Sequence, residues 1–416
     1  MNGMRILFVT QFYWPEVRTA PLNLASLAED LAGRGHEVTV MTAFPNHPFG
    51  RFYDGYRPHL RRWEWLRGVR VLRLPLVPDH SLSAFRRAVN YGSFALSAVS
   101  LGSFLLRRLQ VDVIFAYLPP LSIGFPAARQ GRKKRAPIVF WMTDLWPENL
   151  LAAGARIGPR LLKAISRLED WVYRKASLIC VNSPGYIDNL AAKGVKREKI
   201  RLLTDWADEN LFFPVPYDRG LAEEWNLAGK FTVMYGGNLG KVQGLEVVIE
   251  AARLLSDMPD IRFVLVGDGS ELPRLQAMAA DIGLDNLQFI PRQEPADIHR
   301  FYGLADVLLV HLEKRPIFKM QIPSKIMAYL ACGRPVLCAV EGEAARLIEE
   351  AGAGLTCASG DSPALAGQVR RFYSMSPAER RHMGERARQS YLQHYTRKIQ
   401  LERVEAFLRE AVEAKG

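Results

Sequence analysis

Residues 317–340 read IFKMQIPSKIMAYLACGRPVLCAV and place a basic loop, a helix start and an apolar strand in close succession. Ser324 stands at the expected first turn of the helix, where serine often caps free backbone amides. We therefore expect the amides of Lys325 and Ile326 to point into the preceding loop. A helix N-terminus favours an anion, and Lys319 adds positive charge nearby. An ordinary capped helix between two strands is the alternative.

The rest of the chain alternates short apolar runs with segments of helical periodicity. Fully apolar runs are typical of strands buried on both faces of a parallel sheet, and the intervening helices indicate a doubly wound α/β fold. The expected strands are 4–10, 36–42, 69–74, 111–117, 136–142, 177–182, 199–204, 230–235, 261–266, 286–290, 306–312 and 336–340. The expected helices include 22–31, 121–131, 159–175, 186–193, 244–255, 272–282, 296–302 and 344–351.

The pattern restarts after the proline-rich run 212–217, which we interpret as a linker. We predict two Rossmann-like domains, 1–212 and 218–385, that face a ligand cleft beyond the carboxyl ends of their strands. A chain of 416 residues is long enough for two such cores.

Composition narrows the class of partner. The formal net charge of +12 favours an anionic partner, such as nucleic acid, a phosphorylated ligand or an anionic membrane face. No signal-peptide pattern is evident at the N-terminus. The four cysteines lie in apolar runs without metal-ligand spacing, which indicates a reducing compartment; they are Cys180, Cys332, Cys338 and Cys357.

Glycine-rich turns follow two strands of the second domain. The turn 235–244 (YGGNLGKVQG) contains Gly236 and Gly237, which let the backbone approach a ligand, and Lys241, which can reach a phosphate. A second turn, 267–269, reads GDG. A plain tight turn is the alternative for both.

Carboxylates follow a strand of the first domain. Residues 143–148 (TDLWPE) place Asp144 and Glu148 at the mouth of that sheet, where carboxylates can bind hydroxyls or move protons. The alternative is that Asp144 caps the next helix.

Residues 88–106 carry no charge and are flanked by two arginine pairs, 86–87 and 107–108. The length permits a membrane span, yet glycines and serines keep the run moderately apolar, and the order of the sheet requires a helix here. We interpret it as an interfacial docking helix, with a core helix and a span as alternatives.

Basic residues recur on the same domain. Seven arginines between 51 and 73 are interleaved with Trp63 and Trp65, and 130–135 reads QGRKKR. This combination suits an anionic membrane surface, while a solvated face is the alternative. No recognisable nucleic-acid module accompanies it, so we expect no nucleic-acid partner.

Together these motifs resemble the retaining glycosyltransferases of the GT-B fold, family 4, and among them the WbuB-like O-antigen and capsule enzymes that transfer amino sugars. The resemblance covers nearly the whole chain. The matching segments are 4–16, 33–50, 144–150, 205–214, 235–252, 266–271 and 323–336.

The resemblance implies a nucleotide-sugar bound by the C-terminal domain, an acceptor that enters from the N-terminal domain, and final helices 386–416 that cross back onto the latter. It implies neither a metal nor a cofactor, because basic residues and helix N-termini neutralise the leaving diphosphate. The implied donor-site residues are Gly236, Gly237, Asn238, Lys241, Gln243, Gly267, Gly269, Arg292, Lys319, Pro323, Ser324 and Lys325. Glu16, Thr19 and Asn46 lie on the acceptor side, and Asp144 and Glu148 are the catalytic candidates.

The chain departs from the family pattern at several of these positions. Met320 and Ala328 replace two glutamates that normally meet the sugar and the ribose. Asn238 and Gln243 replace an arginine and a lysine, and Thr143 replaces a histidine. The usual glycine pair after the first strand falls at Thr19 and Ala20. We interpret these changes as a feature of the subfamily.

The implied activity is retaining transfer of an N-acetylated amino sugar from a UDP-sugar to a polyprenyl-diphosphate-linked glycan precursor, in O-antigen or capsule biosynthesis. The enzyme would be cytoplasmic and attached to the inner face of the plasma membrane through its anionic surface. Two alternatives stay open, a UDP-sugar 2-epimerase-like enzyme and an inactive sugar-nucleotide-binding scaffold at the membrane.

Overall fold

The computed structural model describes residues 3–16, 19–56, 59–79, 83–152 and 157–415. It forms two compact units. The first comprises Met1–Asn182, Tyr186–Leu203 and Gln400–Gly416, and the second comprises Ser183–Gly185 and Thr204–Ile399. The chain therefore changes unit near residue 203, before the predicted linker. Residues 386–399, which we expected to pack on the N-terminal domain, belong to the second unit.

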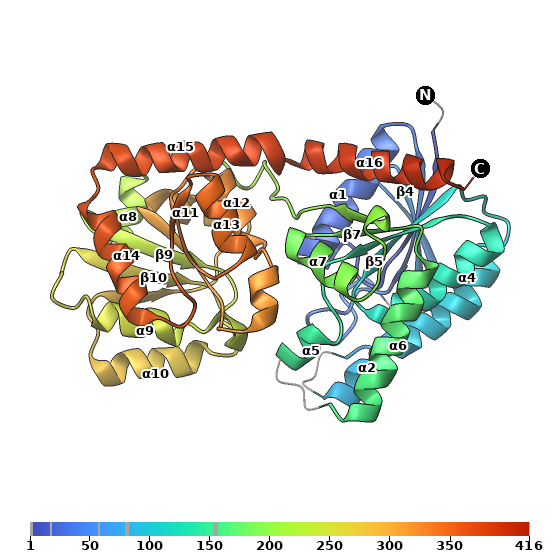
Figure 1. Cartoon of the computed structure of the whole chain (residues 1–416), viewed down its shortest axis with the longest axis horizontal. Coiled ribbons are helices and arrows are strands. Elements are labelled where there is room, and N and C mark those ends of the chain that lie inside the picture. The colour runs from blue at the N-terminus through green and yellow to red at the C-terminus, as the bar shows by residue number, and fades with distance from the viewer. Residues whose placement is uncertain (1–2, 17–18, 57–58, 80–82, 153–156, 416) are drawn as a thin grey trace. The chain divides into compact units, whose positions relative to one another are not determined.

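An eight-stranded sheet forms the centre of the first unit (Figure 1). Its order is β3-β4-β2-β1-β5-β6-β7-β8, and β3 is antiparallel to β4 while the other pairs are parallel. The strands are β1 (Arg5–Val9), β2 (Glu37–Ala43), β3 (Arg62–Leu66), β4 (Val69–Leu74), β5 (Val113–Leu118), β6 (Ile138–Met142), β7 (Leu178–Val181) and β8 (Ile200–Leu202). The helices are α1 (Thr19–Gly33), α2 (Ala84–Ser97), the π-helical η1 (Ala98–Gly102), α3 (Ser103–Leu105), η2 (Leu121–Ile123), α4 (Gly124–Lys134), α5 (Glu148–Ala152), α6 (Pro159–Lys175), α7 (Pro184–Ala192), η3 (Arg197–Lys199) and α16 (Arg397–Glu413).

A six-stranded parallel sheet forms the centre of the second unit, in the order β11-β10-β9-β12-β13-β14. The strands are β9 (Phe231–Gly236), β10 (Ile261–Val266), β11 (Leu287–Ile290), β12 (Val307–His311), β13 (Val336–Ala339) and β14 (Gly354–Thr356). The helices are α8 (Arg219–Glu224), η4 (Lys241–Gln243), α9 (Glu246–Arg253), α10 (Leu272–Ile282), α11 (Ile298–Leu304), η5 (Pro316–Met320), α12 (Lys325–Ala331), α13 (Glu343–Glu350), α14 (Ser362–Ser374) and α15 (Pro377–His394).

Both sheets confirm the predicted α/β class with two Rossmann-like domains. The apolar runs form the central strands because helices cover both faces of each sheet. The sequence did not reveal β3, β14 or α8. In β3 (RWEWL) every residue is exposed or half-buried, so it lacks the apolar run of a central strand.

The uncharged run 88–106 is helical through α2, η1 and α3. In the described part of the chain, Phe85–Leu105 is the one helical run long and apolar enough to cross a membrane, and 33 % of its most apolar window is buried. The run packs against the sheet, where a Cβ on Gly102 would lie 2.6 Å from Met41 Sδ. One face is therefore held by the domain and the other is exposed.

Candidate active site

Two glycine turns touch at the carboxyl edge of the second sheet. Gly237 follows β9 and Gly267 follows β10, and the Gly237 N–H donates to Val266 O at 2.9 Å. Both glycines have positive φ angles, 137° and 148°. A Cβ on Gly267 would collide with the carbonyl oxygen of Gly237. The two turns therefore form one close-packed backbone surface that requires glycine.

Lys325 lies beside these turns, above the ring of Tyr235. Its Nζ is 3.5 Å from the ring centroid and donates to Gln243 Oε1 at 3.3 Å. The Tyr235 hydroxyl lies 2.8 Å from Asn238 O and 2.9 Å from Gln243 Oε1. Burial without a carboxylate partner among the described residues lowers the pKa of Lys325 well below its usual value. An anion bound at Gly237 would favour the charged ammonium.

His311, at the end of β12, fixes the backbone of Gln243. Its Nδ1 donates to Gln243 O at 2.6 Å, and its Nε2 accepts from the Gly360 N–H at 3.2 Å. One donor and one acceptor nitrogen define a neutral imidazole, and burial lowers the pKa of His311. His311 thus positions the residue that contacts Lys325.

Tyr329 joins α12 to the end of β9. Its hydroxyl accepts from the Gly236 N–H at 2.9 Å and donates to Gly236 O at 3.2 Å. Because α12 also carries Lys325, this double contact fixes the lysine relative to the glycine turn.

The expected capping role of Ser324 is wrong. Ser324 occupies the N-cap position with helical φ and ψ of −57° and −25°, and its side chain makes no cap hydrogen bond. The Ile326 N–H donates to Pro323 O at 2.9 Å, so this amide does not face the loop. The helix begins with a tight turn, which uses the group that we expected to bind an anion.

The side chains of the other charged residues predicted for the donor site make no contact with Lys325 or the glycine turns among the interactions of the described residues. Lys319 pairs with Glu341 at 2.9 Å on the surface. Lys241 begins η4 and Arg292 follows β11, and both residues are exposed. Gly269 packs against the backbone of Leu239, where a Cβ would lie 2.5 Å from the carbonyl. The structure thus brings Gly236, Gly237, Asn238, Gln243, Gly267, Gly269 and Lys325 into one constellation.

On the acceptor side, Glu16 and Asn46 meet in the interior of the first unit. Glu16 Oε1 accepts from the N–H groups of Asn46 and His47, both at 2.9 Å. Burial raises the pKa of Glu16 to about 7. Asn46 Oδ1 also accepts from Asn90 Nδ2 at 3.4 Å. Thr19 begins α1, and its side chain lies outside the described part of the structure.

The two catalytic candidates differ in their surroundings. Glu148 forms an ion pair with Lys193 at 2.7 Å, and Lys193 also pairs with the buried Glu169 at 3.0 Å. Asp144 Oδ1 accepts from Asn149 Nδ2 at 2.6 Å, and burial raises the pKa of Asp144. Glu148 is therefore already held by Lys193, whereas Asp144 is half-buried beside the end of β6 and is bonded to Asn149.

Comparisons with known proteins identify the family. A "Glycosyl transferase 4-like domain" model matches residues 23–206, and a "Glycosyl transferases group 1" model matches residues 222–390. The "Putative colanic acid biosynthesis glycosyl transferase WcaI" of Escherichia coli (strain K12) is 30 % identical over 339 residues, which cover 79 % of this chain and 82 % of WcaI. The chain belongs to the group 1 glycosyl transferases.

Further relatives agree with this assignment. The "Probable glycosyltransferase WbjE" of Pseudomonas aeruginosa is 29 % identical and covers 73 % of this glycosyltransferase and 76 % of WbjE. The crystal structure of HepE from Anabaena in complex with UDP matches with a TM-score of 0.74 at 19 % identity, covering 98 % of this chain and 100 % of HepE. This structural likeness confirms the GT-B fold.

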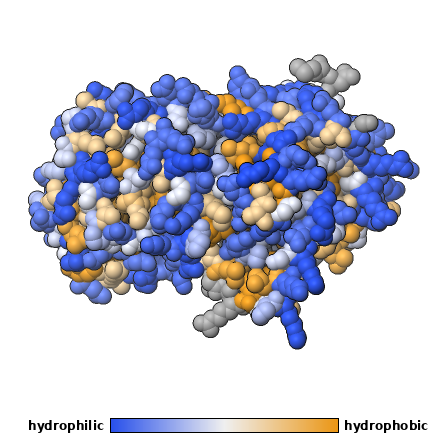
Figure 2. Space-filling view, in the orientation of Figure 1, coloured by the Kyte–Doolittle hydropathy of each residue, from blue (hydrophilic) through white to orange (hydrophobic). Residues whose placement is uncertain are grey.

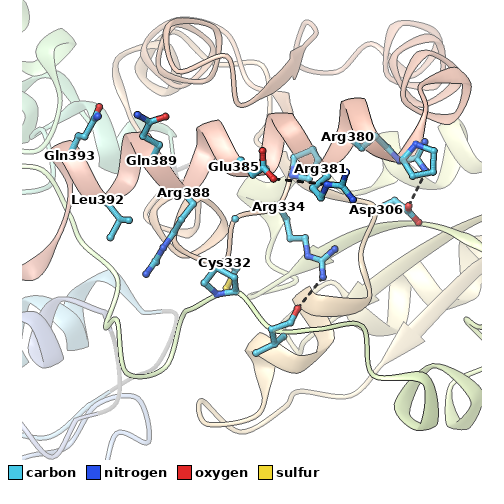
Figure 3. Close-up of a pocket in the computed structure, with 16 residues that line it drawn as sticks. Asp306, Cys332, Arg334, Arg380, Arg381, Glu385, Arg388, Gln389, Leu392 and Gln393 are labelled. Atoms are coloured by element: carbon cyan, nitrogen blue, oxygen red, sulfur yellow. Dashed lines mark hydrogen bonds and ion pairs between the residues drawn. The ribbon is translucent and has the colours of Figure 1, made fainter.

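The second unit of the glycosyltransferase contains a pocket of about 920 Å³ that is separate from the glycine turns (Figure 3). Its lining includes Asp306, directly before β12, and Pro335, directly before β13. It therefore opens at the amino edge of the sheet, opposite the glycine turns. Arginines from α15 and from the turn after α12 line it.

These arginines already stabilise helix ends. Arg388 Nη1 donates to Ala331 O at the end of α12 at 2.6 Å, and Arg334 donates to Gly303 O near the end of α11. Arg380 donates to Phe372 O at 3.1 Å, near the end of α14. Cations at helix C-termini are stabilising, so we assign this pocket a structural role.

Sequence reasoning missed three residues that pack around the glycine turns and Lys325, namely Tyr235, His311 and Tyr329. A signal existed for His311, which is a polar residue ending the apolar strand VLLVH. The described residues contain no group of three or more His, Cys, Asp or Glu side chains placed to hold a metal ion.

Proposed function

We propose that this glycosyltransferase transfers an N-acetylated amino sugar from a UDP-sugar to a polyprenyl-diphosphate-linked glycan precursor in surface polysaccharide biosynthesis, at the inner face of the plasma membrane. The observation that carries the donor half is the constellation of Lys325 with the turns at Gly237 and Gly267. A buried ammonium beside two glycine turns, where the backbone leaves room for a close approach, suits a diphosphate. The similarity to WcaI, a putative enzyme of colanic acid biosynthesis, supports the polysaccharide class, and the likeness to HepE, which was crystallised with UDP, supports a uridine nucleotide.

The proposed reaction retains the anomeric configuration. The bond between the anomeric carbon and the phosphate oxygen breaks, and the acceptor oxygen bonds to that carbon from the same face. The acceptor proton passes to the departing phosphate oxygen. Lys325 stabilises the charge that develops on the diphosphate, which is the role of a preorganised electrostatic group. Neither a metal nor a cofactor takes part in this scheme.

Asp144 has the orienting role on the acceptor side in this proposal, because Glu148 is already held by Lys193. Glu16 and Asn46 hold the backbone that follows β2. Arg292, Lys241 and Lys319 are further candidate contacts for the nucleotide, because they have long side chains at the surface.

Calorimetry without added metal tests the donor half, with UDP, GDP, ADP and CMP compared on the whole chain. Selective UDP binding is expected. Transfer is then measured with UDP-N-acetylhexosamines and membrane lipid acceptors, and proton NMR of the product gives the anomeric configuration. Conversion of the UDP-sugar without acceptor would instead favour the epimerase-like alternative. UDP binding without any turnover would favour the scaffold.

A further inference from the structure

An apolar stripe runs along the exposed side of α2, η1 and α3. Phe85, Leu96 and Phe104 are 76 %, 70 % and 58 % exposed, and Val89 is 37 % exposed. We propose that this docking stripe (Phe85, Val89, Leu96 and Phe104) seats the protein on an anionic phospholipid bilayer. The proposal deepens the proposed function, because a lipid-linked acceptor resides in such a bilayer.

The π-helical turn keeps the stripe on one line. Leu96 and Phe104 are eight residues apart, and in an uninterrupted α-helix that spacing rotates the side chain by about 80°. The π-helix Ala98–Gly102 accommodates more residues per turn. It returns Phe104 to the side occupied by Leu96, and so extends the apolar face beyond the length of α2.

The opposite side of the same helices is fastened to the domain. Asn90 Nδ2 donates to Val77 O at 2.7 Å, and Ser103 Oγ accepts from Gln130 Nε2 at 3.2 Å. Gly102 packs closely against Met41. A membrane span would break these buried contacts, whereas a helix lying flat in the interface keeps them.

The charged residues along the chain from 80 to 111 are all basic. No acidic residue occurs between 80 and 111, or between 113 and 143. Arginine pairs flank the stripe at 86–87 and 107–108, and the Arg107 guanidinium lies 4.2 Å from the Phe104 ring centroid. Apolar side chains bordered by cations match an anionic head-group layer above acyl chains, and this match selects a bilayer as the occupant.

A groove of about 1,120 Å³ lies beside the stripe. Leu96 of the stripe lines it together with Phe125 and Trp171, whose ring centroids are 5.3 Å apart, and Arg129 and Lys175 add charge. Figure 2 shows apolar side chains gathered at the lower edge of the view, in the region where Figure 1 draws α2, α5 and α6, with hydrophilic residues next to them. The groove offers room for an acyl chain below a bound phosphate.

The docking helix also reaches the acceptor side. Asn90, on the buried face of α2, accepts from Gln11 Nε2 at 2.7 Å and contacts Asn46. One helix therefore joins the exposed stripe to the polar cluster at the ends of β1 and β2. Docking on the bilayer would bring this edge of the first sheet to the lipid surface.

Vesicle sedimentation with the full chain tests the proposal. Vesicles of phosphatidylglycerol with phosphatidylcholine are compared with vesicles of phosphatidylcholine alone. We expect binding to the anionic vesicles that weakens with salt, and a loss of about tenfold or more in the variant Phe85→Ser/Leu96→Ser/Phe104→Ser. The matched control is Ile282→Ser/Leu392→Ser, which alters apolar residues of the second unit that are 36 % and 48 % exposed. Far-UV circular dichroism and the melting temperature serve as the folding control for both variants.

A second measurement does not depend on the triple variant. An environment-sensitive fluorophore on Leu96→Cys should shift to shorter emission wavelength on anionic vesicles, while the same label on Ile282→Cys should not. Unchanged vesicle binding in the triple variant, equal binding to neutral vesicles, or self-association that buries the stripe would each overturn the proposal. Vesicle binding without sugar transfer would refute the proposed function alone, and sugar transfer without vesicle binding would refute the docking stripe alone.

Discussion

The ammonium nitrogen of Lys325 lies 3.5 Å from the centroid of the Tyr235 ring, at the edge of the sheet where the glycine turns meet. Aromatic faces attract cations, but they do not replace the hydration that a buried ammonium has lost. The contact with Tyr235 therefore compensates only part of the cost of burying the charge of Lys325, and a bound anion would compensate the rest.

Lys325→Ala should weaken UDP binding by about 10- to 100-fold, since a hydrogen bond to a charged group contributes about 1.5–3 kcal/mol. Lys230→Ala is the matched control, because Lys230 pairs with Asp260 directly before β9, at the edge of the sheet opposite the glycine turns. Calorimetry at one salt concentration measures both affinities. Equal losses in the two variants would contradict the central position that we give to Lys325.

Gly267→Ala should abolish nucleotide binding, because its Cβ would collide with the carbonyl oxygen of Gly237. Gly283→Ala is the control, because it introduces backbone strain without a collision. Gly283 also has a positive φ, 72°, but no atom lies within 4 Å of its Cβ position. We expect Gly283→Ala to lower the melting temperature slightly and to leave UDP affinity intact. A normal affinity in Gly267→Ala would show that the two turns separate easily.

Glu16 should make the protein less stable as pH rises from about 4.5 to 7. Its folded-state pKa is raised to about 7, so in this range the folded state holds a proton that the unfolded state has lost. The native carboxylate above pH 7 thus costs about 3 kcal/mol relative to the acid form. Glu16→Gln should remove this slope. Denaturant melts of both proteins at pH 5 and pH 8 measure the difference, and parallel curves would contradict the assignment.

Lys193→Met should destabilise the first unit by about 3 kcal/mol, because it leaves Glu169 and Glu148 facing each other without their shared cation. Lys196→Met is the control. Lys196 pairs with Glu198 on the surface, where both side chains are more than 70 % exposed, and its loss should have little effect. Thermal melts at neutral pH compare the two, and similar melting temperatures would mean that the cluster is solvated.

The periodicity of the sequence predicted most strands and several helices closely, because apolar runs and caps are local signals. It could not predict that Lys319 pairs with Glu341, 22 positions away, or that His311 holds Gln243. These contacts depend on which strands become neighbours in the sheet. Ser324 was predicted wrongly for a different reason. Serine is a common capping residue, but the Ile326 N–H bonds to Pro323 O and the Ser324 side chain makes no capping hydrogen bond.

The glycine turns were found because glycine tolerates φ angles that other residues avoid. Tyr235 and Tyr329 were missed because buried tyrosines usually belong to the core. Their hydroxyl groups become informative when their partners, Gln243 and Gly236, are known.

The last part of the chain bears on how donor preference can be exchanged between such enzymes. The second unit ends at Ile399 and the first resumes at Gln400, within α16. A recombinant hybrid that replaces the second unit by a single crossover would therefore mismatch the final segment with its host. A working graft needs two junctions, one near Leu203 and one inside a helix. Under the proposed function, point substitutions within the second unit would therefore change donor preference more readily than an exchange of whole units.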